Sequence, residues 1–483
     1  MNTIPPPRFR SNRAGSHPFQ DGVLRLITLL CALAFWPGSA FAQGSSAMLR
    51  TTYANPTPAF GDYFGASVAA LENDRVLIGE GAGAAYLFSV SGALLTTFTI
   101  SDPDAFDFGN PVLGVGKDHV LISSYSYGTT SQIGRAYFFT SSGSLLTIFT
   151  NPNPARVQAF GASLATLGND RVLIGGPADP SKSAPFLASV YLFGTNGTLL
   201  TTITNPTPAV HNAFGIFGIA AVGRDRVIVG APDADTGAWR AGVAYLFNTN
   251  GVLLNTFTNP APTSEDNFGT AVAAVGNDRV LISANDYGRL KNGGAAYLFN
   301  TNGTLLTTFT NPTPPATDPA TSDYFGQSVA AVGSTRVLIG AYSDDTGAKN
   351  AGSAYLFSTN GTLLQTITNP VPAAGTVFGV SVAAVGTSRL LIGTPGANTG
   401  APGSGAAYLF DLPYPPLSIE RNAAAVSLKW VTPETGLTLQ ESGRLGTPTE
   451  WEDTVNSASI NGPTNVVQQT QGTTNRFYRL RRP

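Results

Sequence analysis

The feature that most constrains this chain is a sequence unit repeated seven times. A Phe-Gly dipeptide recurs at intervals of 44 to 57 residues, and each copy is followed in order by a Val-Leu-Ile-like run and a Tyr-Leu-Phe-like run. Self-similarity at such a period indicates a repeat architecture in which each unit buries its apolar face against the next. The copies begin at Phe64, Phe108, Phe160, Phe214, Phe268, Phe325 and Phe378.

Within each unit the residues predict four short strands. In the fifth unit, Asn277 and Asp278 form a tight turn after the first apolar run, and Asn302-Gly303 forms a second turn. Asn-Gly between two β-branched runs is a strong hairpin signal, and the following Asn311-Pro312 ends the last strand because proline cannot donate to a ladder. Four strands in about 50 residues, repeated seven times, are typical of propeller blades. These strands are expected at 268–275, 279–283, 295–299 and 304–310.

The two ends of the repeat region predict that the array closes into a ring. The last unit stops after Tyr408-Leu409-Phe410 and lacks a fourth strand, whereas 49–56 matches that strand but precedes the first Phe-Gly. Pairing the N-terminal strand into the last blade would remove the exposed edges of an open array. We therefore expect an all-β fold, a seven-bladed β-propeller of four-stranded blades closed by the N-terminal strand. The alternative is an open β-solenoid.

The first 42 residues resemble an export signal. Four arginines precede an apolar run at 26–36, and Ala40-Phe41-Ala42 gives a small-residue cleavage pattern. The run is too short to span a bilayer about 30 Å thick, and no other segment is long and apolar enough. We expect residues 1–42 to be a signal peptide cleaved after Ala42, and the mature protein to be secreted or extracellular. The single cysteine, Cys31, would leave with this leader.

Composition and a change of pattern indicate the remaining organisation. Charged residues make up only 12 % of the chain, and 54 glycines and 34 prolines favour short strands joined by tight turns. Basic residues are thinly spread, which excludes a nucleic-acid footprint. We expect the propeller at 47–412, a stiff linker at 413–416 and, at 417–483, a small C-terminal β-sandwich similar to fibronectin type III modules.

The order of motifs resembles the FG-GAP repeat of integrin-α-type propellers. Ile228-Val229-Gly230-Ala231-Pro232 is nearest to the "GAP" portion. The resemblance implies the seven-bladed fold and, with less force, a binding or adhesive role, because a fold does not determine a function. Many such repeats carry an Asp-rich calcium loop before the "GAP" strand, but here that place holds only short turns such as Gly276-Asn277-Asp278. We therefore expect neither a metal nor a cofactor.

Strand order sorts the loops onto two faces. The turns after the first and third strands of each blade are short, whereas the connections after the second and fourth strands are long and variable. Because binding groups gather on irregular loops held by a rigid scaffold, we expect the second face to bind ligand. Trp, Tyr and Arg are common interface anchors. The candidates there are Tyr125, Tyr127, Trp239, Arg240, Tyr287 and Tyr342.

These long loops also carry acidic residues, including Asp233, Asp235, Asp344 and Asp345. They suit either a relocated cation site or Asx-type turns, in which the side chain accepts a bond from the backbone two residues on. We favour the turns. The arginine that begins the second strand in six of the seven repeats, such as Arg279, is expected to pair with turn carbonyls or carboxylates rather than with phosphate.

Little in the chain resembles catalytic machinery. Only His119 and His211 lie outside the leader, in different repeats and without cysteine. The sequence predicts no enzyme but an extracellular binding or adhesion module, monomeric, that recognises a protein or polysaccharide. One alternative is a secreted carbohydrate-active enzyme that uses carboxylates near the propeller axis. Another is a structural protein of an envelope or matrix.

Overall fold

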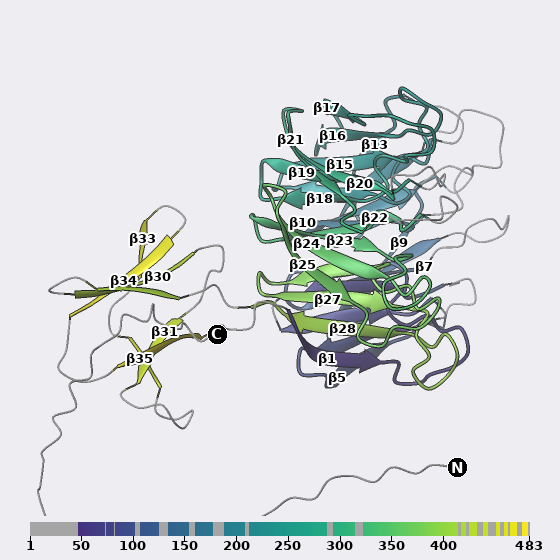
Figure 1. Ribbon diagram of the computed structural model, residues 1–483. Coiled ribbons are helices and arrows are strands. Elements are labelled where there is room, and N and C mark those ends of the chain that lie inside the picture. Colours follow the sequence, from purple (N-terminus) through teal and green to yellow (C-terminus); the bar gives the residue numbers. More distant parts are fainter. Residues whose placement is uncertain are drawn as a thin grey trace, which may run out of the picture. The chain divides into compact units, whose positions relative to one another are not determined.

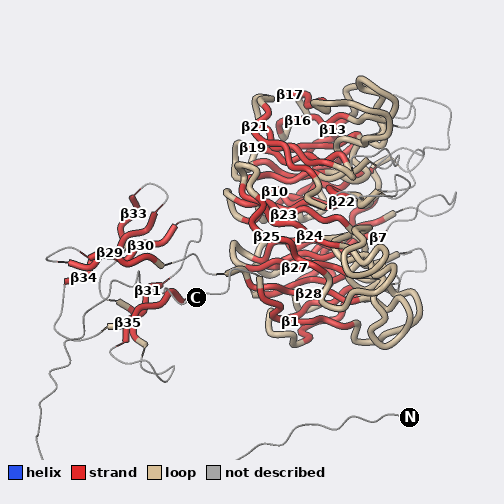
Figure 2. Tube along the Cα trace, viewed as in Figure 1, coloured by secondary structure: helices blue, strands red, loops and turns tan. Residues whose placement is uncertain are grey.

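The computed structural model describes residues 47–483 with gaps at 73, 82, 102–106, 125–133, 154–159, 177–187, 208–211, 287–292, 314–321, 414–416, 422–424, 432–437, 443–450, 455–457, 462–463, 471–475 and 482–483. The expected leader and most of the linker therefore lie outside the described residues. Every element described is a strand (Figure 2). Seven four-stranded antiparallel sheets form the propeller (Figure 1), which confirms the predicted fold.

Each of the first six blades uses four consecutive strands, from the innermost to the outermost. In chain order they are β2(Ser67–Leu71), β3(Arg75–Gly79), β4(Ala85–Ser89), β5(Leu94–Phe98); β6(Val112–Val115), β7(His119–Ser124), β8(Arg135–Thr140), β9(Leu145–Thr150); β10(Leu164–Leu167), β11(Arg171–Gly176), β12(Ser189–Gly194), β13(Leu199–Thr204); β14(Ile219–Val222), β15(Arg226–Ala231), β16(Val243–Asn248), β17(Leu253–Thr258); β18(Val272–Val275), β19(Arg279–Ala284), β20(Ala295–Asn300), β21(Leu305–Thr310); and β22(Phe325–Val332), β23(Arg336–Ala341), β24(Ser353–Ser358), β25(Leu363–Thr368).

The seventh blade closes the ring as the sequence predicts. It consists of β26(Val382–Val385), β27(Arg389–Thr394) and β28(Ala406–Asp411), and its outermost strand is β1(Met48–Ala54) from the N-terminal end. The two strands pair antiparallel, with Tyr53 opposite Ala407 and Met48 opposite Asp411. Tyr53 is buried and its ring packs 5.2 Å from that of Phe88 in the first blade. Closure therefore joins both ends of the repeat region in one hydrophobic contact.

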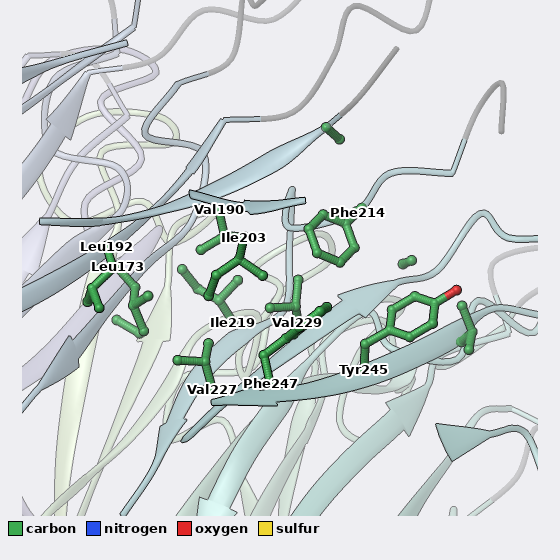
Figure 3. Packing of buried hydrophobic residues seen from close by; sticks show 14 of the residues in the cluster. Leu173, Val190, Leu192, Ile203, Phe214, Ile219, Val227, Val229, Tyr245 and Phe247 are labelled. Carbon is green, nitrogen blue, oxygen red and sulfur yellow. The ribbon is translucent and has the colours of Figure 1, made fainter. Parts of the chain in front are cut away.

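The core lies between neighbouring blades. Phe214 of the fourth Phe-Gly is fully buried, with its ring centroid 6.1 Å from those of both Tyr245 and Phe247. Side chains of the third blade pack against this group (Figure 3). They include Leu173, Val190, Leu192 and Ile203. Burial of each such side chain contributes roughly 1.5–3 kcal/mol. The repeated Phe-Gly and Tyr-Leu-Phe aromatics are thus structural, as predicted.

A repeated arginine links five of the blades to the next on the short-turn side, whereas the second blade has His119 at this position. Its guanidinium donates to a backbone carbonyl in the first turn of the following blade. Arg226 reaches the carbonyl of Asn277 and Arg279 that of Ser334, each over 2.6 Å. The guanidinium of Arg279 also lies 3.6 Å from the carboxylate of Asp278. Paired in this way, these arginines have the structural role that the sequence predicts.

The C-terminal region forms two sheets. One contains β29(Ser418–Arg421), β30(Ala425–Val431), β34(Thr464–Thr470) and β33(Ser459–Asn461); the other contains β32(Glu452–Asp453), β31(Thr438–Ser442) and β35(Phe477–Arg481). Leu428, Trp430 and Val467 from the first sheet share a core with Leu439 and Leu480 from the second. The predicted β-sandwich is confirmed. Its likeness to fibronectin type III modules stays a prediction.

Candidate ligand-binding face

The long loops that the structure describes lie on one face of the propeller, on the right in Figure 1. Along this face, which we call the long-loop face, the segments entering the first, fifth and seventh blades are hydrogen-bonded to the preceding blade's loop. Backbone amides of Glu265, Asn267 and Phe268 donate to carbonyls at 239, 240 and 241 over 2.8–3.0 Å. The same ladder joins 375–378 to 349–351 and 61–64 to 402–404. At these three junctions the irregular loop backbone is therefore held in place by the neighbouring blade.

Three of the loops after the second strands share one backbone design. Asp235 accepts a bond from the amide of Arg240 over 2.8 Å, and Asp345 accepts one from Asn350 over 2.7 Å. The corresponding loop at 394–405 repeats this bond with Asn398 and Gly403. The carboxylates thus hold the loop backbone. Together with Asp344, which accepts from the amide of Thr346 over 2.7 Å, this confirms the predicted turn chemistry.

These three loops share a backbone conformation but carry different side chains at their tips. The equivalent pairs are Trp239-Arg240, Lys349-Asn350 and Pro402-Gly403. The second member has a positive φ of 51°, 52° and 66° in turn. A left-handed conformation disfavours side chains with a Cβ, yet Arg240 and Asn350 occupy it. The scaffold therefore presents different side chains in one repeated geometry.

A second repeated position has the same property. The residue before each described Phe-Gly has a φ between 52° and 55° but is not glycine. At Val377 this conformation is strained, because β-branched residues rarely adopt it. Side-chain identity changes from blade to blade while the backbone does not. The described members are Tyr63, Asp107, Ala213, Asn267, Tyr324 and Val377.

The Trp239-Arg240 pair is the most prominent described tip. Trp239 is 56 % exposed, and the Arg240 guanidinium carbon lies 5.7 Å from its ring centroid. Arg240 is in turn held by the Asp233 carboxylate, 2.7 Å from its Nη2. Asp233 also accepts a bond from the side-chain amide of Asn267 over 3.0 Å. An exposed indole is thereby set beside a charge whose position is fixed.

Of the other predicted residues, Tyr342 alone lies in the described part of the chain. Its ring stacks on that of Tyr324 with centroids 4.9 Å apart and planes 8° from parallel. Tyr324 is one of the left-handed residues, so two repeated features meet at this aromatic pair. Tyr125, Tyr127 and Tyr287 lie outside the described residues.

Buried carboxylates lie beneath the long-loop face at the junction where the ring closes. Asn55, directly after β1, donates from its side chain to Asp62 over 2.8 Å and to Glu80 over 3.1 Å. All three residues are buried. Burial, together with the nearby charge of Asp62, raises the pKa of Glu80 from 4.5 to about 7. The Tyr86 hydroxyl also donates to Glu80, over 3.4 Å.

A related network lies between the fifth and sixth blades. Asn311 donates to Asp323 over 2.6 Å, and the hydroxyl of Tyr355 donates to Asp344. Burial raises the pKa of Asp323 from 3.8 to about 6, and the charges of Asp344 and Asp345 act in the same direction. In both networks amide and hydroxyl donors satisfy buried carboxylates, so these groups bind the blades to each other.

Sequence reasoning missed these networks. The Asn-Pro motif was assigned only to strand termination, but its asparagine also binds the carboxylate of the entering segment. Recurrence of Asn-Pro in step with an Asp seven or twelve residues later, as at Asn55, Asn259 and Asn311, was the available signal. Across the ranges that the structure describes, no three His, Cys, Asp or Glu side chains gather as a metal site. Within the same ranges, no helix has the length and apolarity to cross a membrane.

Two segments of the chain match the sequence model of a known repeat family. Residues 315–357 and 362–410 match the model of the FG-GAP repeat. These two segments are FG-GAP repeats. These two matches cover the sixth and seventh blades, and the other five blades share the same four strands and aromatic core. No curated protein is significantly similar in sequence.

Solved structures that resemble this chain share its propeller architecture at low identity. Raptor of Chaetomium thermophilum matches with a TM-score of 0.51 and 12 % identity over 78 % of this chain and 29 % of that one. The structure of U3-55K matches with a TM-score of 0.50 and 12 % identity over 76 % of this chain and 98 % of that one. The chain thus spans less than a third of Raptor. These likenesses show the fold alone.

Proposed function

We propose that this chain is an exported, non-catalytic binding module that recognises a protein or polysaccharide through its long-loop face. The observation that carries the proposal is the repeated loop with a constant frame and a variable tip. The left-handed conformation of Arg240 and Asn350 belongs to the constant frame, because their amides donate to Asp235 and Asp345, whereas the side chains at these positions differ. Backbone strain of this kind gathers at ligand-binding sites.

The chemistry of the Trp239-Arg240 tip supports the proposal. Indole and guanidinium groups are the commonest hot spots of protein interfaces, and an indole face also stacks on a sugar ring. Because Asp233 already orients Arg240, binding would cost little side-chain entropy. The carboxylates that a glycosidase would need, such as Glu80 and Asp62, are instead buried and engaged by Asn55.

A pair of matched variants tests the proposal. Val252 lies in the same blade as Trp239, is equally exposed at 56 %, but follows the short turn on the opposite face. The mature chain, residues 43–483, is screened against immobilised polysaccharides and an exoprotein panel, with analysis of released sugars. We expect retention that Trp239→Ala weakens at least tenfold and Val252→Ala leaves unchanged, because Trp hot spots contribute 2 kcal/mol or more.

Three results would contradict the proposal. Absence of any retention would remove the binding function. Equal loss in both variants would show that the long-loop face is not the site. Release of reducing sugar would instead establish the carbohydrate-active enzyme. Thermal unfolding of each variant serves as the control for folding.

A further inference from the structure

The place on the long-loop face where the seventh blade meets the first exposes two aromatic side chains. We call it the closing junction, and it consists of residues 57–63 and 398–403. Phe60 and Tyr63, from the segment that enters the first blade, are 83 % and 52 % exposed. The amides of residues 61 and 63 donate to carbonyls at 402 and 403 over 3.1 and 3.0 Å. The backbone that carries both rings is therefore held by the neighbouring loop.

Three glycines border the side chain of Tyr63. They are Gly61, Gly81 and Gly403, and a Cβ placed on any of them would lie 3.7–3.9 Å from a side-chain atom of Tyr63. Because glycine has no side chain, none of these neighbours covers the ring. The fifth blade has buried Asn267 at the same position of its entering segment. The open aromatic ring is therefore particular to the closing junction when these two segments are compared.

A neutral hydrogen-bonding group lies close to this ring. The Oδ1 of Asn398 accepts from the amide of Gly403 over 2.8 Å, which fixes the carboxamide at a glycine that also borders Tyr63. Asn398 is exposed, and no acceptor in the described part of the chain takes a bond from its Nδ2. The equivalent residues of the other two loops, Asp235 and Asp345, have carboxylates that cannot donate. Among these three loops, only the one at the closing junction offers a donor at this position.

The closing junction also lacks exposed charge. Residues 57–63 and 398–403 are all described, and their one acidic or basic side chain, Asp62, is buried. The equivalent tips of the other two loops carry Arg240 and Lys349. A charged ligand would lose hydration at the closing junction without gaining a partner of opposite charge. The chemistry of this surface therefore favours an uncharged ligand.

An open aromatic ring, a carboxamide donor and the lack of exposed charge together match a neutral sugar. The C–H face of a pyranose stacks on an aromatic ring, and its hydroxyls accept hydrogen bonds from an amide. An apolar peptide side chain would contact the rings equally well. It would, however, cover the Nδ2 of Asn398 without giving it an acceptor, and an unpaired buried donor is unfavourable.

We infer that the closing junction is a subsite for one neutral sugar ring of a polysaccharide. Tyr63 provides the stacking surface, Phe60 adds exposed aromatic area beside it, and Asn398 donates to a hydroxyl. This inference rests on the proposed function, because it assigns a ligand class to a second region of the same long-loop face. Trp239 lies at another junction, between the fourth and fifth blades, so the two assignments can fail separately.

The ring variant combines Phe60→Ser with Tyr63→Asn. The fifth blade has Ser264 and Asn267 at these two positions, and Asn267 has the same left-handed backbone as Tyr63, with φ of 55° and 54°. The fold is therefore expected to survive, as circular dichroism and thermal unfolding would verify. The control is Val371→Ala, which removes exposed apolar area from the segment that enters the seventh blade; Val371 is 65 % exposed.

The donor variant is Asn398→Asp. The fourth-blade loop has Asp235 at this position and keeps the frame with it, because a carboxylate can still accept from the amide of Gly403. The substitution replaces the neutral donor with a charged group that only accepts. It therefore separates recognition of a sugar hydroxyl from stacking on the rings.

Affinity electrophoresis of the mature chain provides the readout, in gels that contain xylan, mannan, galactomannan, dextran or hydroxyethyl cellulose. We expect at least one of these neutral polysaccharides to slow the wild type. The ring variant should bind that polysaccharide at least about tenfold more weakly, because two aromatic contacts are lost. The donor variant should bind it roughly two- to tenfold more weakly, and Val371→Ala as tightly as wild type.

A wild type that none of these polysaccharides slows would overturn the inference, as would an equal loss of binding in the ring variant and in Val371→Ala. Trp239→Ala, run in the same gels, separates the inference from the proposed function. If it weakens binding and the ring variant does not, the long-loop face is still the binding site but the closing junction is not a subsite. Binding of a protein that the ring variant abolishes, without any binding of polysaccharide, would also overturn the inference by showing a peptide occupant.

Discussion

Protonation of Glu80 should control the stability of the junction that closes the ring. Burial and the Asp62 charge raise the pKa of Glu80 from 4.5 to about 7. Since a raised pKa means that the folded chain binds the proton more tightly, this stabilisation is fully present below pH 4.5. It is lost as the pH rises through 7. The shift corresponds to about 3 kcal/mol, at about 1.4 kcal/mol for each pKa unit.

Glu80→Gln isolates this contribution. Glutamine cannot ionise but keeps an oxygen that can accept from Asn55 and Tyr86, as Glu80 does. Urea unfolding at pH 4.5, 6 and 7.5 gives the free energy of unfolding of both proteins. Between the two extremes, wild type should lose up to about 3 kcal/mol more than the variant. Other titrating groups are common to both proteins and cancel in this difference.

A local measurement distinguishes this mechanism from a general effect of pH. Asn55 directly follows β1, so ionisation of Glu80 should loosen the closing strand first. Hydrogen exchange in Met48–Ala54, corrected for its intrinsic pH dependence, should be faster at pH 7.5 than at pH 5 in wild type only. If wild type and Glu80→Gln lose equal stability over this range, the carboxyl is not protonated at the junction and the reasoning is refuted.

Three further predictions follow from the same contacts. Tyr53→Ala should lower the free energy of unfolding by roughly 3 kcal/mol, because the ring is buried against Phe88, whereas half-exposed Leu49→Ala in the same strand should cost under about 1 kcal/mol. Denaturant titration compares the two, and equal losses would mean that β1 is not docked. Asp323→Asn should remove a fall in stability between pH 4 and 6, and an unchanged pH profile would count against its raised pKa. Calorimetric titration with calcium should give no saturable heat, because Asp235 and Asp345 already accept backbone bonds; a micromolar site would contradict this.

The repeat made the scaffold predictable from sequence. Seven copies of three ordered motifs determine the number of blades, and the displaced strand at 49–53 determines closure, because both depend on local pattern alone. The frame of the long loops was predictable for the same reason: Asp235 and Asp345 carry the signature of a turn. Each motif lies within a few tens of residues of chain, where propensity and turn chemistry act, although the strands that close the ring come from opposite ends of the repeat region.

The features that sequence reasoning missed depend on where blades meet. Nothing local shows that Glu80 lies beside Asp62, because their proximity follows from the way the entering segment lies along the neighbouring loop. Nor does a Leu-Leu pair reveal its exposure. The same β-branched and apolar pattern describes the buried third strands, and only the position at the outer edge leaves Leu200 about half exposed. Burial is a property of the assembled ring.

The two faces of the propeller therefore place different constraints on residue identity. On the short-turn face the repeated arginines bind five of the blades to the next, so their identity is tied to the ring. The frame of the long loops is equally constrained, but the left-handed tips are not, since Arg240, Asn350 and Gly403 all occupy one conformation. A position with a constant backbone and a variable side chain can change in identity without loss of the fold. Specificity is therefore expected to reside at these tips, and stability at the buried networks beneath them.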